Sequence, residues 1–314
     1  MAKDPIWWAG PICGLGNRMM ALAAARACAD GRPIRFTWSN DESCPGAYSD
    51  IFTSSPIFAP GEAPPPGAAV IHTGWEPYGI FETFKEALGL DISRAEFSRR
   101  LLAALDTSPF LGAHVSAAQA WRVAEDAAAP LIGVHVRRTD RTEQHRRQFR
   151  DFLLRRSGLV REIPVLLSAF YGLAPNAWIC SYENAMLTTA IRRFGEGKSS
   201  YAYAVFADDE AEARNVEKAT VRRAPKALKR KGPDREPLPQ LQRLRRTSLS
   251  CAMADLLCLA QCDAIAQSNR ASTFSLVAAI IGRKPILTPK TLYPFWLKLE
   301  EDLGAAPNAA PISL

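Results

Sequence analysis

The sequence lacks the features that mark a membrane protein or a disulfide scaffold. No apolar run approaches the roughly 18 residues that a membrane-spanning helix needs. The opening residues, MAKDPIWWAG, contain no basic segment followed by a long apolar stretch, so we expect no secretory signal and a cytoplasmic location. The seven cysteines include no pair separated by two residues, and their number is odd. Disulfide scaffolds, collagens and membrane channels are therefore excluded, and reduced thiols are expected.

Three of the cysteines recur on one face of a predicted helix. Cys251, Cys258 and Cys262 lie seven and then four residues apart in a stretch of strong helix formers. A metal site is one interpretation of this spacing, but no histidine lies nearby in the sequence. Small thiols are common in protein cores, so core packing is the prediction.

One segment carries the net charge. The chain of 314 residues has 39 Lys and Arg against 32 Asp and Glu, a net charge of +7. Residues 222–246 hold ten of the basic residues and two of the acids, so this segment has a net charge of +8 and the remainder −1. The segment also contains four prolines and no aromatic residue for base stacking. We predict a long solvated or site-covering loop, with a nucleic-acid site as the alternative.

Strands and helices alternate in both halves of the chain. Residues 6–9 form a short apolar run, a glycine-rich turn follows over 10–17, and strong helix formers then lead to a second strand at 34–38. Further strands are predicted at 131–136, 202–206, 264–266 and 284–287, with helices between them and a terminal helix over 292–303. At about 150 residues per domain, this pattern predicts two doubly wound α/β domains with parallel sheets.

The densest group of polar side chains follows the strand at 131–136. That strand is almost continuously apolar, as expected for a strand buried on both faces. Charged residues follow it at once: Arg137, Arg138, Asp140, Arg141 and Glu143. Ligands bind at the carboxyl ends of parallel strands, and guanidinium groups bind phosphate oxygens in pairs. A site for a phosphate-bearing ligand is therefore predicted, with His135 either part of it or a core histidine.

Other strand ends carry weaker signals. The stretch 267–275 joins a strand to a helix of small residues, and its hydroxyl and backbone N–H groups suit an anion, although an ordinary helix cap is the alternative. Asp208 and Asp209 follow the strand at 202–206, where helix capping explains them equally well. Asp255 is a carboxylate among the apolar residues of the helix predicted over 248–261.

Together these motifs resemble a known family. The stretch IGVHVRRTD is similar to the signature of the α-1,6-fucosyltransferases. The strand ending at Asp208-Asp209, the stretch MADLLCLAQCDAIAQS and the stretch STFS follow in that family's order. The N-terminal GLGNRMMALAAARACA, followed by a strand ending in Trp38, also looks like the bacterial members. The resemblance covers residues 10–45 loosely and 130–285 by motif.

The resemblance implies a fold and a reaction. The family has the GT-B architecture, in which two Rossmann-like α/β domains face a cleft, and it transfers fucose from GDP-fucose to a glycan hydroxyl with inversion and without a metal. We accordingly expect an acceptor-side α/β domain over 1–129 and a GDP-sugar-binding α/β domain over 130–290. A C-terminal helix within 291–314 is expected to pack back on the first domain. GDP-fucose and a glycan are the expected partners, with no cofactor and no nucleic acid.

Residue by residue, the resemblance assigns roles. Arg137 would stabilise the departing GDP, and Glu143 would deprotonate the acceptor hydroxyl. His135 and Asp255 would contact the guanine. The remaining donor-binding residues would be Arg138, Asp140, Arg141, Asp208, Asp209, Ser272, Thr273, Phe274 and Ser275. In the animal enzymes two more residues precede the Thr-Glu pair, so His145 competes with Glu143 for the role of base.

Three questions stay open at this level. The sequence does not name the acceptor, the linkage or the oligomeric state. A transferase of the same fold that uses another nucleotide sugar is an alternative. So is a non-catalytic protein that binds anions or nucleic acid through residues 222–246.

Overall fold

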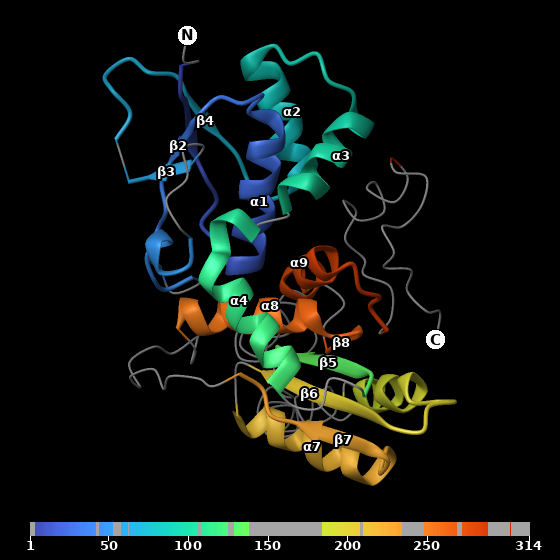
Figure 1. The fold of residues 1–314 in the computed structure, drawn as a ribbon. Helices are drawn as coiled ribbons and strands as arrows, with labels where there is room; N and C mark the ends of the chain where they lie inside the picture. The colour runs from blue at the N-terminus through green and yellow to red at the C-terminus, as the bar shows by residue number, and fades with distance from the viewer. Residues whose placement is uncertain are drawn as a thin grey trace, which may run out of the picture.

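Two four-stranded parallel sheets form the centres of two α/β domains (Figure 1). The computed structural model describes residues 4–41, 44–52, 58–61, 63–105, 108–124, 129–137, 184–207, 210–233, 248–268, 272–287 and 302. The strand order is β3-β2-β1-β4 in the first sheet and β7-β6-β5-β8 in the second. All the strand pairs within the two sheets are parallel. This arrangement confirms the predicted fold class of two Rossmann-like α/β domains.

The first sheet buries one face under a helix that is itself buried on nearly all sides. Its strands are β1 (Ile6–Ala9), β2 (Ile34–Phe36), β3 (Phe58–Pro60) and β4 (Val70–His72), and its helices are α1 (Leu15–Cys28), α2 (Pro77–Leu88) and α3 (Arg94–Leu105). Trp8 and Phe36 point into the buried face, where Phe84 of α2 meets the Trp8 ring edge-on at 6.2 Å between ring centroids. Helix α1 is rich in alanine and is buried nearly all round, because α2, α3 and a helix of the second domain all pack against it.

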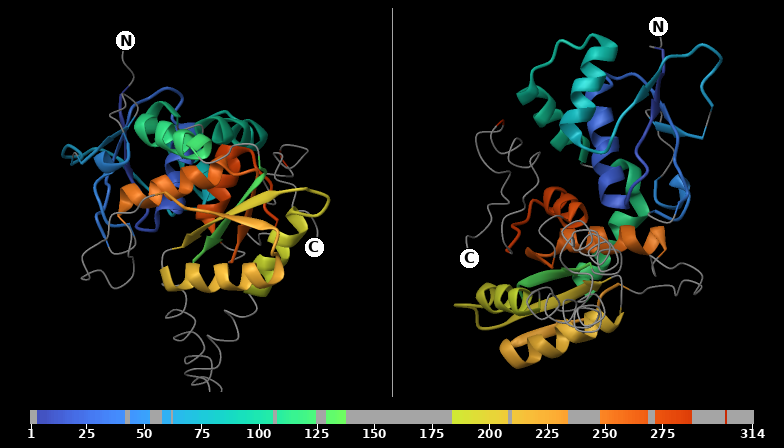
Figure 2. Two further views of the ribbon diagram at one scale, coloured as in Figure 1. Left: turned by 60° about the horizontal axis from the view of Figure 1, so that its bottom comes forward. Right: turned by 180° about the vertical axis from the view of Figure 1, so that it is seen from behind.

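The second sheet is covered by helices on both faces (Figure 2). Its strands are β5 (Leu131–Val136), β6 (Tyr201–Ala207), β7 (Ala227–Arg230) and β8 (Ala264–Gln267); its helices are α7 (Glu210–Arg223), α8 (Leu249–Gln261), α9 (Thr273–Gly282) and residues 184–194. Every residue of β5 is buried. A Cβ atom on Gly133 would lie 2.7 Å from Cδ2 of Leu259 and 2.9 Å from Sγ of Cys262, so only glycine lets α8 pack this closely.

Helix α4 (Ser108–Ala124) connects the two domains. Its Trp121 indole donates to the backbone oxygen of Lys231 at 3.1 Å. The Arg230 guanidinium lies 4.7 Å from the centre of the Trp121 ring and donates to the backbone oxygen of Arg122 at 2.8 Å. A cation held over an indole in this way stabilises the contact beyond its buried area. Helix α4 therefore packs along the second domain although it precedes the predicted boundary at residue 129.

The basic segment is more ordered than its composition indicates. Where a loop was predicted over 222–246, Arg222 and Arg223 end α7, and β7 pairs with β6 as an edge strand. Arg230 is buried against α4, and Lys229 forms an ion pair with Glu217 at 2.8 Å. The prediction of a loop was wrong for this part because tertiary contacts override a sequence of low β-propensity. Residues 234–247 lie outside the described part of the chain.

Other elements differ from the predictions at their ends. Helix α1 begins at Leu15, inside the stretch 10–17 that was predicted to be a glycine-rich turn. The strand expected at 284–287 is reduced to a single bridge between Ile286 and Ile265. Of the terminal helix expected over 292–303, only Asp302 is described, and it is helical. In the described residues, no helix has both the length and the apolar character needed to cross a membrane.

The cysteines of α8 belong to the core. Cys251, Cys258 and Cys262 are all buried, which confirms the prediction of core packing. Burial raises the pKa of the Cys258 thiol to about 12, so this thiol stays protonated and unreactive at neutral pH. Among the described residues, no three His, Cys, Asp or Glu side chains are arranged to hold a metal ion.

Candidate functional site

The N-termini of α1 and α9 meet where the carboxyl edges of the two sheets face each other. A Cβ atom on Gly16 would lie 2.7 Å from the backbone nitrogen of Phe274 and 2.9 Å from the carbonyl carbon of Thr273, so the two backbones are in contact. Neither helix has an acidic residue in its first turn. Each helix N-terminus carries roughly half a positive charge, so the meeting of two such ends without a carboxylate favours an anion.

The start of α9 is organised by a histidine from β5. Nδ1 of His135 lies 2.6 Å from Oγ of Ser275 and 3.3 Å from Oγ of Ser272, and the imidazole stacks on the Phe274 ring at 4.8 Å between centroids. Ser272 is the N-cap of α9, and its Oγ accepts from the backbone N–H of Ser275 at 3.4 Å. His135, Ser272, Thr273 and Ser275 are all buried. The four residues of the STFS stretch and His135 therefore lie together in one group of side chains.

Arg137 stands at the same edge. It is the first residue after β5, it is half-buried, and its backbone N–H donates to Oγ of Ser268 at 3.1 Å. The backbone N–H of Ser268 in turn donates to the carbonyl oxygen of His135 at 2.9 Å. These bonds tie the ends of β5 and β8 together. The backbone of Arg137 is therefore fixed at the end of β5, two residues after His135, which contacts the first turn of α9.

Arg18 is a buried residue near the glycine-rich turn that the sequence analysis did not single out. Its guanidinium is buried, donates to the backbone oxygens of Cys13 at 2.7 Å and Ser39 at 2.6 Å, and forms an ion pair with Asp41 at 2.5 Å. It also lies 4.6 Å from the centre of the Trp38 ring. Arg18 thus fastens the glycine-rich turn before α1 to the segment after β2. The available signal was an arginine in the first turn of a helix whose one other charged residue is Arg26.

The remaining predicted site residues are placed only in part. Asp255 lies on α8 and is buried. The others fall outside the described residues: Arg138, Asp140, Arg141, Glu143, His145, Asp208 and Asp209. Their roles stay predictions.

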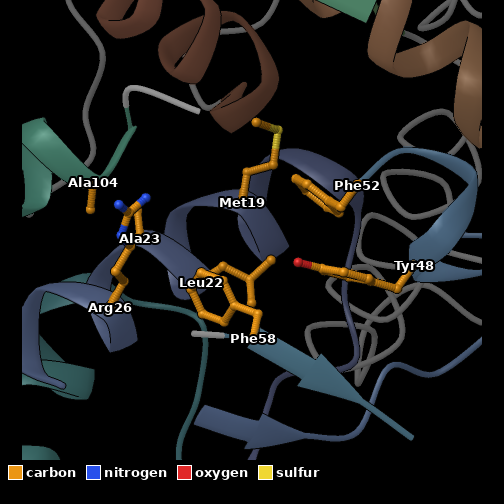
Figure 3. A pocket seen from close by; sticks show the side chains of 8 residues that line it. All are labelled: Met19, Leu22, Ala23, Arg26, Tyr48, Phe52, Phe58 and Ala104. Atoms are coloured by element: carbon orange, nitrogen blue, oxygen red, sulfur yellow. The ribbon is translucent and has the colours of Figure 1, made fainter. Parts of the chain in front are cut away.

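A small cavity lies between α1 and a group of aromatic side chains of the first domain (Figure 3). It is lined by Met19, Leu22, Tyr48, Phe52 and Phe58 among others, with Arg26 at its side. Its water-accessible volume is about 20 Å³, which is room for about one water molecule. This cavity is therefore too small to hold a sugar or a nucleotide.

Comparisons with known proteins find likenesses in fold alone. No protein-family model matches the sequence, and no curated protein is similar to it. The solved fucosyltransferase NodZ from Bradyrhizobium aligns with a TM-score of 0.49 and 13% identity over 92% of this chain and 96% of that chain. POFUT1 in complex with GDP aligns with a TM-score of 0.46 and 12% identity over 90% of this chain and 97% of that chain. At this level of similarity, the function has to be argued from the residues of the chain itself.

Proposed function

We propose that this chain is an inverting glycosyltransferase that moves fucose from GDP-fucose to a glycan hydroxyl without a metal ion. The observation that carries the proposal is the meeting of two helix N-termini, free of acidic residues in their first turns, with Arg137 two residues after the histidine that bonds to the start of α9. The choice of fucose and guanine comes from the resemblance of the IGVHVRRTD and STFS stretches to the α-1,6-fucosyltransferases.

The departing group explains why this geometry suits the reaction. When the bond between the sugar and the diphosphate breaks, negative charge develops on the β-phosphate. Backbone N–H groups at a helix start and a guanidinium held on a fixed strand end stabilise that charge without reorganising. In this proposal Arg137 supplies the counter-charge that a divalent ion supplies in other transferases.

We propose for His135 a role other than contact with the guanine. Because Nδ1 of His135 is engaged by Ser275 and Ser272, the imidazole holds the start of α9 in place. We therefore assign His135 as a positioning residue for the phosphate site, and keep Asp255 as the residue that accepts from the guanine N–H groups. Glu143 remains the proposed base, with His145 as its competitor.

Nucleotide binding without a metal is the first test. GDP is added to the full chain in the presence of EDTA. The Tm is measured by thermal unfolding, and GDP binding is measured by calorimetry. A ligand at 100 times its Kd stabilises the folded state by about 2.7 kcal/mol, so GDP is expected to raise the Tm. UDP and CDP are the matched controls and are expected to raise it less.

Two results would change the conclusion. If GDP gives neither a Tm shift nor heat, the proposal fails. If UDP stabilises the chain as strongly as GDP, the alternative of another nucleotide sugar replaces it. Hydrolysis of GDP-fucose in the absence of an acceptor, compared with hydrolysis of GDP-mannose, then decides which sugar the site accepts.

A further inference from the structure

A hollow larger than the cavity beside α1 lies at the carboxyl end of β4, in the first domain. It is lined by residues of the turn that joins β4 to α2, including His72, Thr73, Trp75 and Glu76, and by Thr83 of α2. Its water-accessible volume is about 460 Å³, within the range of roughly 300–1,000 Å³ typical of small-molecule sites.

The hollow opens on the same sheet edge as the glycine-rich turn. His72 pairs with Ala9 in the parallel register of β4 and β1, and Ala9 is followed directly by the turn that leads to Gly16. Gly16 in turn contacts the start of α9. Because the carboxyl ends of parallel strands share one edge, the hollow and the phosphate site lie on the same side of the first sheet.

The walls of the hollow are held by bonds that need no ligand. The Trp8 indole N–H donates to Oγ1 of Thr73 at 2.8 Å, which ties the turn to β1. Glu76 is the N-cap of α2 and accepts from the backbone N–H of Gly79 at 2.6 Å. Trp75 packs against the core and is half-buried. The site is therefore preformed, which lowers the entropy that a ligand loses on binding.

The lining residues favour a neutral polyol over a phosphate. No Lys or Arg is among the lining residues that the structure describes, and Glu76 contributes a carboxylate that repels an anion. An indole offers an apolar face, while imidazole, hydroxyl and carboxylate groups offer donors and acceptors. A sugar ring has both surfaces, with C–H groups on its face and hydroxyls at its edge.

We infer that this hollow binds a sugar unit of the glycan acceptor. Trp75 is the stacking platform, and His72 and Glu76 hydrogen-bond the sugar hydroxyls. The inference rests on the proposed function, and it names the residues of the first domain that would hold the acceptor.

The test separates acceptor binding from donor binding. Wild-type chain is first given GDP-fucose on a glycan array to find the glycan that accepts fucose, and that glycan is then used for kinetics. W75A and H72A are each expected to raise its KM by about 10-fold, which corresponds to about 1.4 kcal/mol of lost binding free energy. The affinity for GDP, measured by calorimetry, is expected to stay at the wild-type value in both variants. W75F keeps an aromatic face and should recover most of the affinity for the glycan.

Matched controls guard against a loss of structure. W7A removes a half-buried tryptophan from β1, outside the lining of the hollow, and is expected to keep the wild-type KM. The His72 side chain is exposed, so H72A decides the question if W75A fails to fold.

Three outcomes overturn the inference. A KM unchanged in folded W75A and H72A removes the sugar from the hollow. A parallel loss of GDP affinity places the nucleotide there instead. A wild-type chain that hydrolyses GDP-fucose but transfers to no glycan on the array shows that the acceptor is not a sugar, whereas a chain that binds no GDP overturns the proposed function itself.

Discussion

The two sheets share one strand order and differ in what covers them. In each sheet the first strand lies inside, with the second and third strands on one side of it and the fourth on the other. Helices α8 and α9 cover one face of the second sheet, while α7 and residues 184–194 cover the other. The described helices cover only one face of the first sheet, and Trp7 and Arg35 on its other face are half-buried.

The two domains also differ at the N-termini of α1 and α9, where these helices meet. The N-cap of α9 is Ser272, whose hydroxyl bonds to the helix backbone and lies beside His135. The N-cap of α1 is Gly14, which has no side chain to offer, and Gly16 presents bare backbone to α9. The second domain thus supplies fixed polar groups, and the first supplies close approach. One topology therefore supports two different halves of a proposed transfer site.

Removing the cation of the second domain should have the largest effect. Arg137→Ala is expected to lower kcat by about 10²–10³-fold, because a group aimed at developing charge in the transition state is lost. The Tm should stay close to the wild-type value, because the side chain is half-buried at a strand end. Transfer rates and thermal unfolding are the measurements.

The control for this prediction is Arg99→Ala, which removes a 65%-exposed guanidinium from α3 and should leave transfer unchanged. If Arg137→Ala keeps wild-type transfer while GDP still binds, Arg137 is not the group that stabilises the leaving diphosphate.

Adding a methyl group at the contact between the two helices should have the next largest effect. Gly16→Ala places Cβ at 2.7 Å from the Phe274 nitrogen, so α1 and α9 must move apart. Overpacking of this kind costs typically about 1–3 kcal/mol, and the GDP site should weaken along with the fold. Denaturant unfolding and calorimetry with GDP measure the two effects.

Gly232→Ala is the matched control, because its added Cβ meets only the backbone oxygen of Val205 at 3.6 Å. If both variants lose the same free energy of unfolding, the close packing of α1 against α9 is not what makes Gly16 necessary.

Two serine caps of the second domain sharpen the comparison further. Oγ of Ser272 accepts from the Ser275 N–H at 3.4 Å, and Oγ of Ser248 accepts from the Cys251 N–H at 3.1 Å. Replacing either cap with alanine should cost about 1 kcal/mol of stability. Only Ser272→Ala should also weaken GDP binding, and a matching loss in Ser248→Ala would argue against an anion site at α9.

The smallest effect is expected at Asp302, which contacts the first domain. Burial raises the pKa of this carboxyl, but hydrogen bonds donated by Ser98, Arg94 and Tyr78 outweigh burial and lower it. A lowered pKa means that the contribution to stability is complete above about pH 4 and is lost as the pH falls through the folded-state pKa.

Asp302→Asn should therefore lower the Tm at neutral pH, and its difference from wild type should shrink below about pH 4. Thermal unfolding across this pH range measures both. Asp91→Asn, at an exposed position, should show neither change. A difference that grows on acidification would contradict the assignment.

Much of the fold follows from local patterns. The continuous apolar run at 131–136 predicts β5 with the bounds that the structure has, and the helix cap that was one interpretation of the stretch 267–275 is Ser272. Alternating strands and helices predict parallel sheets, because a crossover helix is the usual return path between parallel strands. These signals are local, so they can be read from neighbouring residues.

Other features were decided by contacts between distant residues. Arg18 forms an ion pair with Asp41, and Gly16 contacts the backbone of Phe274. Strand β7 forms because it pairs with β6 at the edge of the second sheet. The turn that lines the hollow at His72 to Glu76 is tied to β1 by the hydrogen bond from Trp8 to Thr73. Hydrophobic periodicity predicts which face of a helix or strand is buried. It does not predict which distant residues pack against that face. The identity of the residues near the candidate site was therefore visible in the amino-acid order, whereas their convergence on two helix N-termini required the folded chain.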